Sequence, residues 1–164
     1  MSEATEGPAG ASLDLGAYVP FHLISIANAW SRGASAIFLK RFGVGVHDWA
    51  VISTLKIEPG ANALRVREIS TGDKGSISRS LVRLEAQGMV RSTAAARDPR
   101  RRRYELTEAG AAAHDQMRDI SLRREMALLD GLSAADRTQL LAQLKRLERN
   151  LATLGETDQA EVGE

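Results

Sequence analysis

The sequence contains no cysteine among its 164 residues. Disulfides, thiolate metal sites and sensors that act by thiol oxidation are therefore excluded. No apolar run reaches the roughly 18 residues that a membrane-spanning helix needs, and residues 1–10 lack the basic and then apolar order of a secretory signal. We therefore expect a protein of the cytoplasm that makes no contact with a membrane.

The sequence also lacks the residue groupings that enzymes use. We find no nucleophile with a partner base, no paired carboxylates and no phosphate loop. The run from Thr71 to Gly75 has glycines and a lysine, but not the spacing of a phosphate loop. The three histidines, His22, His47 and His114, are far apart and lack further ligands at metal spacing. We therefore expect no catalytic activity, no cofactor and no metal.

The net charge of +1 conceals an uneven distribution. Residues 74–104 contain nine Lys and Arg against two acidic residues, so this segment carries +7 and the remainder carries −6. Hydrophobic residues make up 43% and charged residues 26%, which is typical of a globular domain. The pattern predicts one folded domain with a basic face that attracts a nucleic acid from one side.

Apolar residues recur at helical spacing from Leu13 to about Arg41, which predicts one long helix, or a short one that continues into a long one. Pro20 is expected to bend its start. Gly43 and Gly45 interrupt the pattern, and three shorter helices follow, the last closed by Gly88. The predicted segments are a disordered tail at 1–12, a dimerisation helix at 13–45, a DNA-binding lobe at 46–107, further dimerisation helices at 108–154 and a disordered acidic tail at 155–164.

The fourth predicted helix has two different faces. Ile77, Leu81 and Leu84 form one apolar stripe, while Gly75, Arg79 and Arg83 lie roughly opposite. A short helix of this kind after another short helix is typical of a helix-turn-helix, in which the second helix enters the major groove. Arg79 is the best candidate to read guanine because a guanidinium matches its paired acceptors. Weaker base readers would be Ser76, Ser78 and Ser80, and phosphate ligands would be Lys74 and Arg83.

An arginine-rich hairpin is predicted directly after this helix. Its strands are Met89–Thr93 and Arg102–Leu106, and Asp98-Pro99 forms the turn between them. A basic run is most often a solvated loop. Here its position favours a wing that meets the adjacent minor groove, which attracts arginine. The residues concerned are Arg97, Asp98, Arg100, Arg101, Arg102 and Arg103.

Two helices complete the chain. Thr107 is the expected N-cap of the first, which ends at Asp130-Gly131, and Ser133 is the expected N-cap of the second. In the second helix, leucines alternate at spacings of four and three residues up to Leu154, which is the period of a coiled-coil seam. Such a seam needs a partner helix. One subunit could supply it, but dimerisation through both ends of the chain fits better.

Three stretches resemble the multiple antibiotic resistance regulators (MarR family) of bacteria: FGVGVHDWAVISTL, DKGSISRSLVRLEAQGMVR and RDPRRRRYELTEAG. The resemblance runs from about Phe21 to Leu154. It implies a homodimer whose terminal helices form the interface and whose two winged lobes bind a pseudo-palindromic DNA site. It also implies that Asp98 braces the wing, that Arg100 enters the minor groove, and that a small aromatic or anionic ligand releases a repressor. The absence of cysteine excludes the peroxide-sensing branch of that family.

We therefore expect a mainly α fold, a winged helix-turn-helix with terminal dimerisation helices, that binds double-stranded DNA as a transcriptional regulator. The alternative is a winged adaptor whose arginines bind an acidic protein, and a steep salt dependence of duplex binding would distinguish the two. Trp30 and Trp49 are candidates to line an effector cleft, although a tryptophan at helical spacing more often belongs to the core.

Overall fold

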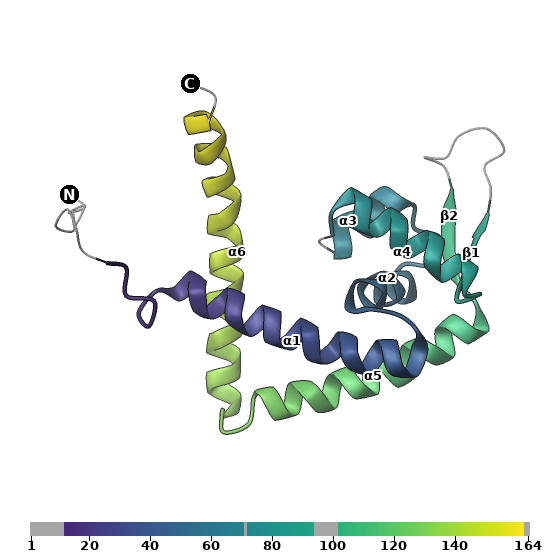
Figure 1. Cartoon of the computed structure of the whole chain (residues 1–164), viewed down its shortest axis with the longest axis horizontal. Coiled ribbons are helices and arrows are strands. Elements are labelled where there is room, and N and C mark those ends of the chain that lie inside the picture. The colour runs from purple at the N-terminus through teal and green to yellow at the C-terminus, as the bar shows by residue number, and fades with distance from the viewer. Residues whose placement is uncertain (1–11, 71, 94–101, 163–164) are drawn as a thin grey trace. The chain divides into compact units, whose positions relative to one another are not determined.

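Six helices and one hairpin make up the part of the chain that the structure, a computed structural model, describes: residues 12–70, 72–93 and 102–162, with only the backbone at 152, 153 and 155–162. The elements are α1 (Val19–Phe42), α2 (Val46–Ile57), α3 (Ala63–Ser70), α4 (Lys74–Ala86), β1 (Val90–Thr93), β2 (Arg103–Leu106), α5 (Glu108–Leu128) and α6 (Ala134–Val162) (Figure 1). This arrangement confirms the predicted winged helix-turn-helix, which is mainly helical with a small β-wing. No helix in the described ranges is both long and apolar enough to cross a membrane.

The chain divides into two compact units, residues 1–118 and 119–164, and the division falls within α5. The first unit contains α1 to α4, the hairpin and the first half of α5. The second contains the end of α5 and the whole of α6. The basic segment identified in the sequence belongs entirely to the first unit.

Helix α1 begins at Val19 and not at Leu13. Pro20 stands in its first turn, where the missing N–H of proline costs nothing, so it starts the helix instead of bending it as the sequence predicted. Before the helix, Asp14 accepts a hydrogen bond from the Gly16 amide at 2.9 Å in a turn. The helix ends at Gly43, which has a φ of 69°, a conformation that favours glycine.

The core of the first unit lies where α2, α3 and α4 meet. The predicted stripe of α4, Ile77, Leu81 and Leu84, is at most 3% exposed. From the other elements the core takes side chains that are equally inaccessible: Phe38, Val44, Val51, Ile52, Leu55, Ala61, Val66 and Val90. Burying this stripe fixes which side of α4 is turned outward.

The hairpin is antiparallel, with Val90 opposite Leu106 and Thr93 opposite Arg103. Tyr104 is buried and Arg103 is exposed, as expected for neighbouring residues of a strand. The backbone of Tyr104 also bonds outside the hairpin, because its N–H donates to the Ala61 carbonyl at 3.0 Å and its carbonyl accepts from the Gly60 amide at 2.9 Å. The hairpin is thereby attached to the loop between α2 and α3.

Local caps start the last two helices as predicted. The Thr107 hydroxyl accepts from the Gly110 amide at 3.1 Å at the start of α5. At α6, the Ser133 hydroxyl accepts from the Asp136 amide at 3.2 Å and Asp136 Oδ2 accepts from the Ser133 amide at 3.0 Å, which is a capping box. Hydrogen bonds from Ser133 lower the pKa of the Asp136 carboxyl group.

Helix α6 continues to Val162, whereas the sequence predicts an acidic disordered tail from residue 155. The residues after Gly155 include Glu, Gln and Ala, which favour helix, and one interior glycine costs only about 1 kcal/mol relative to alanine. The tail segment is therefore helical in its backbone up to Val162.

Candidate nucleic-acid interface

The outward side of α4 presents the residues that could meet DNA. Lys74, Ser78 and Arg79 are exposed and Ser76 is half-buried. The Arg79 Nη2 donates to the Ser76 hydroxyl at 3.4 Å, which is at the long limit of a hydrogen bond. The guanidinium is thus held only weakly by Ser76. A side chain that leaves an internal partner to bind a ligand needs such a weak contact.

The beginning of α4 is fixed by Asp73. Its Oδ1 accepts a hydrogen bond from the Ser76 amide at 2.9 Å, which is the usual N-cap arrangement. The hydrogen bonds from Ser76 lower the pKa of this carboxyl group. Because the cap sets where the helix starts, it also sets where Lys74, Ser76 and Ser78 lie.

A cavity of about 450 Å³ opens between α3 and the first turns of α4. It is lined by Asn62, Ala63, Leu64, Arg67, Lys74, Ile77 and Ser78. Arg67 and Lys74 are both exposed cations, and Leu64 is exposed as well. The surface in front of the helix-turn-helix is therefore concave and positively charged, and it suits the convex backbone of a polyanion.

Ser80 is not on this outward side, contrary to the sequence-based expectation. It is 1% exposed and belongs to the buried side of α4. The reason is the period of the helix, because Ser80 stands three residues after Ile77 and four before Leu84. The side chain cannot reach a base edge from there.

Arg83 is engaged within the protein, where the sequence predicted a phosphate ligand. Its Nη2 donates to Oδ1 of Asp48 at 2.6 Å and its Nε donates to Oδ2 at 3.0 Å. Asp48, in the first turn of α2, is 0% exposed, whereas the Arg83 side chain is 49% exposed. Asp48 Oδ2 also accepts from the Gly45 amide at 2.8 Å, so the buried carboxylate is supplied with donors.

The base of the wing holds Arg102 in a similar way. Its Nη2 donates to both carboxylate oxygens of Glu85 at 3.0 and 3.1 Å, and its Nε donates to the Ser92 hydroxyl at 2.7 Å. Its guanidinium also lies 5.6 Å from the centre of the Tyr104 ring. Arg102 therefore ties the wing to α4, and it is a brace more than a DNA ligand.

Arg103 points outward and donates from Nη1 to the Gly60 carbonyl at 3.2 Å. The remaining wing residues that the sequence singled out lie outside the described ranges: Arg97, Asp98, Arg100 and Arg101.

Trp49 is packed between two other rings. It lies 5.9 Å from Phe38 of α1 and stacks on His114 of α5 at 5.3 Å, measured between ring centres. Trp30 is half-buried on α1, more than two helical turns before Phe38. Trp49, which is half-buried, thus joins three helices of the first unit.

The histidines have separate surroundings. His22 contacts the Gly16 carbonyl at 2.8 Å, His47 is exposed, and His114 contacts Asp115 Oδ1 at 2.9 Å. The contact with His114 lowers the pKa of Asp115, with smaller contributions from Lys56 and Arg118. Within the described ranges, no group of three or more His, Cys, Asp or Glu side chains is placed to hold a metal ion.

Sequence reasoning missed Asp48, Glu85 and Gln87. Each contacts a residue that is distant along the chain, and the Gln87 Nε2, for example, donates to the Gly43 carbonyl at 2.9 Å. The one available signal was the position of Asp48 directly before the apolar run of residues 49–52, since a buried acid requires a partner.

No protein-family model matches the chain. Solved structures do resemble it. A MarR/EmrR family transcriptional regulator from Acinetobacter sp. ADP1 has a TM-score of 0.77 at 24% identity and covers 86% of this chain and 99% of its own.

Two further similar structures were solved with a bound molecule. The S. aureus MepR-DNA complex has a TM-score of 0.71 at 18% identity over 82% of this chain and 96% of its own. The PcaV transcriptional regulator from Streptomyces coelicolor, in complex with its natural ligand, has a TM-score of 0.73 at 20% identity. The match covers 85% of this chain and 97% of the PcaV chain. The Acinetobacter and Streptomyces coelicolor proteins are transcriptional regulators. The chain therefore has the fold of the MarR-family transcriptional regulators.

Proposed function

We propose that this protein is a transcriptional regulator that binds double-stranded DNA in a sequence-specific manner through α4 and the wing. The observation that carries the proposal is the two-sided character of α4. Its apolar side is buried in the core, and its other side turns Lys74, Ser78 and Arg79 to the surface. The fold is shared with the S. aureus MepR-DNA complex, which supports a DNA-binding role.

In this proposal, the residues of α4 and of the wing have different roles. The fork of Arg79 matches the O6 and N7 acceptors of guanine, and Ser76 and Ser78 reach neighbouring base edges. Lys74, at the start of the helix, neutralises a phosphate. The wing arginines, Arg97, Arg100, Arg101 and Arg103, meet the minor groove or its phosphates, and Asp98 braces the wing.

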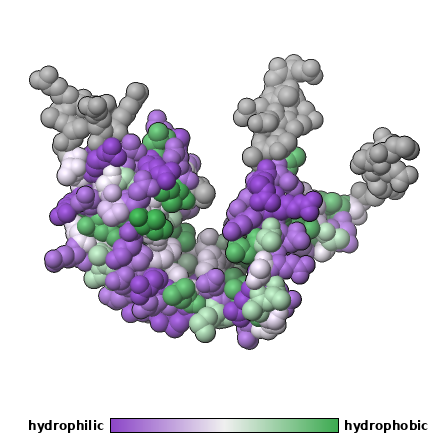
Figure 2. Space-filling model, turned by 180° about the vertical axis from the view of Figure 1, so that it is seen from behind, coloured by the Kyte–Doolittle hydropathy of each residue, from purple (hydrophilic) through white to green (hydrophobic). Residues whose placement is uncertain are grey.

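The protein acts as a homodimer in this proposal. Helices α1, α5 and α6 expose many large apolar side chains, and exposed apolar patches are typical of protein–protein interfaces. They include Val19, Phe21, Leu23, Ile24, Ile26, Leu122, Met126, Leu128, Leu140, Leu141, Leu147, Leu151 and Leu154. Hydrophobic patches are visible among the hydrophilic surface in Figure 2.

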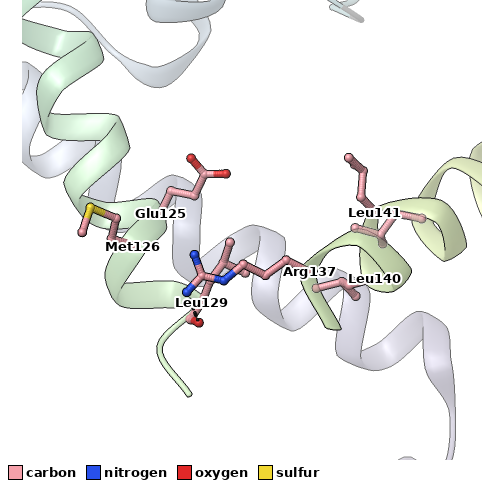
Figure 3. Close-up of a pocket in the computed structure, with 7 residues that line it drawn as sticks. Glu125, Met126, Leu129, Arg137, Leu140 and Leu141 are labelled. Carbon is pink, nitrogen blue, oxygen red and sulfur yellow. Dashed lines mark hydrogen bonds between the residues drawn. The ribbon is translucent and has the colours of Figure 1, made fainter. Parts of the chain in front are cut away.

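The second unit contributes an apolar cavity to this exposed surface. Met126 near the end of α5 and Leu129 just after it, with Leu140 and Leu141 of α6, line a mainly apolar cavity of about 380 Å³ (Figure 3). Side chains of a second copy would fill this space and remove its apolar lining from water. A two-fold dimer would present two α4 helices to a pseudo-palindromic site whose half-sites lie about 10 bp apart.

We further propose that the protein is a cytoplasmic repressor released by a small aromatic or anionic ligand. Support comes from the similar PcaV structure, which was solved with its natural ligand. Trp30 is a candidate to line the effector site. Trp49 is a weaker one because its ring already packs on Phe38 and His114.

The test combines selection of binding sequences from random duplexes with affinity measurements at several salt concentrations. We expect a two-fold symmetric site and a logarithmic salt slope that reports several phosphate contacts. For Arg79→Ala, we expect discrimination at one base position of each half-site to fall by about 1–3 kcal/mol. Lys56→Ala, which removes an exposed cation from α2, is the matched control and should keep the site preference.

Four outcomes would contradict the proposal. An unselective, salt-insensitive interaction would remove the DNA-reading role, and an unchanged base preference in Arg79→Ala would remove the role of that residue. Binding of an acidic protein in place of a duplex would favour the adaptor. A footprint over a single half-site would argue against the dimer.

A further inference from the structure

The ion pair between Asp48 and Arg83 joins the recognition helix to the N-terminus of α2. We propose that Asp48 is a positioning residue for sequence recognition. Its buried carboxylate holds Arg83 in a fixed geometry and thereby sets the orientation of α4 and of Arg79 on its outward side. This inference rests on the proposed function.

The geometry of the pair restricts orientation as well as distance. Arg83 uses two nitrogens against the two oxygens of Asp48, at 2.6 and 3.0 Å, and such a planar fork tolerates little rotation. The carboxylate itself is immobile because it is 0% exposed and also accepts from the Gly45 amide at 2.8 Å. Rotation of α4 about its axis would break both contacts.

A second bond lies one turn further along the same side of α4. Gln87, four residues after Arg83, donates from Nε2 to the Gly43 carbonyl at 2.9 Å. Both partners, Gly43 and Asp48, flank the short connection between α1 and α2. The C-terminal half of α4 is therefore attached to this connection at two points, while its N-terminal half carries the proposed base readers.

Binding of Arg83 to a DNA phosphate is the competing interpretation, because the side chain is 49% exposed. The two interpretations differ in what happens when Asp48 is changed. If Arg83 is a phosphate ligand, removing the negative charge at position 48 frees its guanidinium and leaves binding equal or tighter. If the pair positions α4, the same change misplaces Arg79 and weakens specific binding.

The experiment compares Asp48→Asn, Arg83→Gln, the double variant and the control Lys56→Gln. Asparagine preserves size and an acceptor for Gly45, but it presents an NH₂ group to the N–H groups of Arg83. Lys56→Gln removes an ion pair that α2 makes with Asp115 of α5, not with α4. Affinities for the selected duplex and for an unrelated duplex are measured against salt, at temperatures where each variant is folded.

We expect Asp48→Asn and Arg83→Gln each to lower the ratio of specific to nonspecific affinity by about 10-fold, the discrimination of one bidentate base contact. The double variant should lose no more than either single variant, since both remove one interaction. The salt slope of Asp48→Asn should equal that of the wild type. The control should keep the wild-type ratio.

Two results would overturn the positioning role. In the first, Arg83→Gln weakens both duplexes equally with a slope shallower by about one charge, and Asp48→Asn binds as well as the wild type. In the second, both variants lower only the melting temperature and keep the wild-type base preference.

A DNA-independent measurement separates this inference from the proposed function. If the wild type binds no duplex in dilute buffer, the proposed function fails. Hydrogen exchange of the free protein then still tests whether the Asp48–Arg83 ion pair holds α4 in place. Faster exchange across α4 in Asp48→Asn than in Lys56→Gln would support the positioning role of Asp48, and equal exchange would reject that role.

Discussion

Gly110 stands at the closest approach between α5 and the backbone before β1. A Cβ built at this position would lie 1.9 Å from the Met89 carbonyl oxygen and 2.9 Å from its carbon. That oxygen is already occupied, because it accepts from the Thr107 amide at 3.0 Å. In Gly110→Ala the Cβ to oxygen separation must grow by about 1.5 Å, from 1.9 Å to the 3.4 Å of an ordinary contact.

Two effects of opposite sign compete in Gly110→Ala. Replacing glycine by alanine within a helix stabilises it by about 1 kcal/mol. Overpacking costs about 1–3 kcal/mol, and here the upper end applies because the obstacle is backbone and not a flexible side chain. The net expectation is destabilisation by roughly 2 kcal/mol, which lowers the melting temperature by about 4–8 °C in a chain of this size.

Thermal unfolding followed by circular dichroism measures this difference. Ala112→Gly, at an exposed position of the same helix, is the control that reports helix propensity alone, and it should lose about 1 kcal/mol. A Gly110→Ala protein that melts at or above the wild-type temperature would show that the approach of α5 to Met89 is not as close as described. The helix-propensity gain would then be the larger effect.

Three further predictions rest on the structure and one, for Arg100, on the sequence alone. Leu84→Ala, at a position that is 0% exposed, should cost about 2–5 kcal/mol in chemical unfolding, and a smaller loss would mean that the core collapses around the gap. The pKa of Asp73 is lower in the folded protein than its ordinary value of 3.8, so its stabilisation is fully present above that value and is lost as the pH falls through the lower pKa of the folded protein. Asp73→Asn should therefore lose less stability than the wild type between about pH 6 and about pH 3, and equal losses would contradict the N-cap role. Arg100→Ala should weaken binding to all duplexes with a shallower salt slope, and an unaltered slope would reject a phosphate or minor-groove contact. Met126→Glu, on the exposed apolar side of α5, should shift sedimentation from dimer to monomer, whereas an unchanged dimer would place the interface elsewhere.

Several features of the fold and of the candidate site could be predicted because their causes are local. The stripe of Ile77, Leu81 and Leu84 follows from the helical period, and its burial decides which side of α4 faces outward. The caps at Thr107 and Ser133 act on amides three residues away. The sequence is therefore sufficient for the order of the elements and for the outward position of Arg79.

Other features could not be predicted, although some signals were present. Ser80 is an exception, because the stripe of Ile77, Leu81 and Leu84 located in the sequence already places residue 80 on the buried side of α4, and its burial was therefore open to prediction. Beyond Gly155, α6 depends on the helix propensities of the individual residues, each of which is small. The acidic composition of this short segment does not reveal them. The start of α1 at Val19 depends on how Pro20 is used, since proline is compatible with a first turn and with a bend.

Which cations of the basic segment pair with a carboxylate of the protein was decided only by the tertiary structure. Residues 48 and 83, and likewise 85 and 102, are brought together by the packing of separate helices and strands, and nothing in the local sequence specifies either pair. Arg79, Arg83 and Arg102 look alike in a sequence, because each is a cation within one basic segment. Their functions differ because a buried or half-buried carboxylate stands opposite two of them, and in a medium of low dielectric such a carboxylate binds the nearest guanidinium.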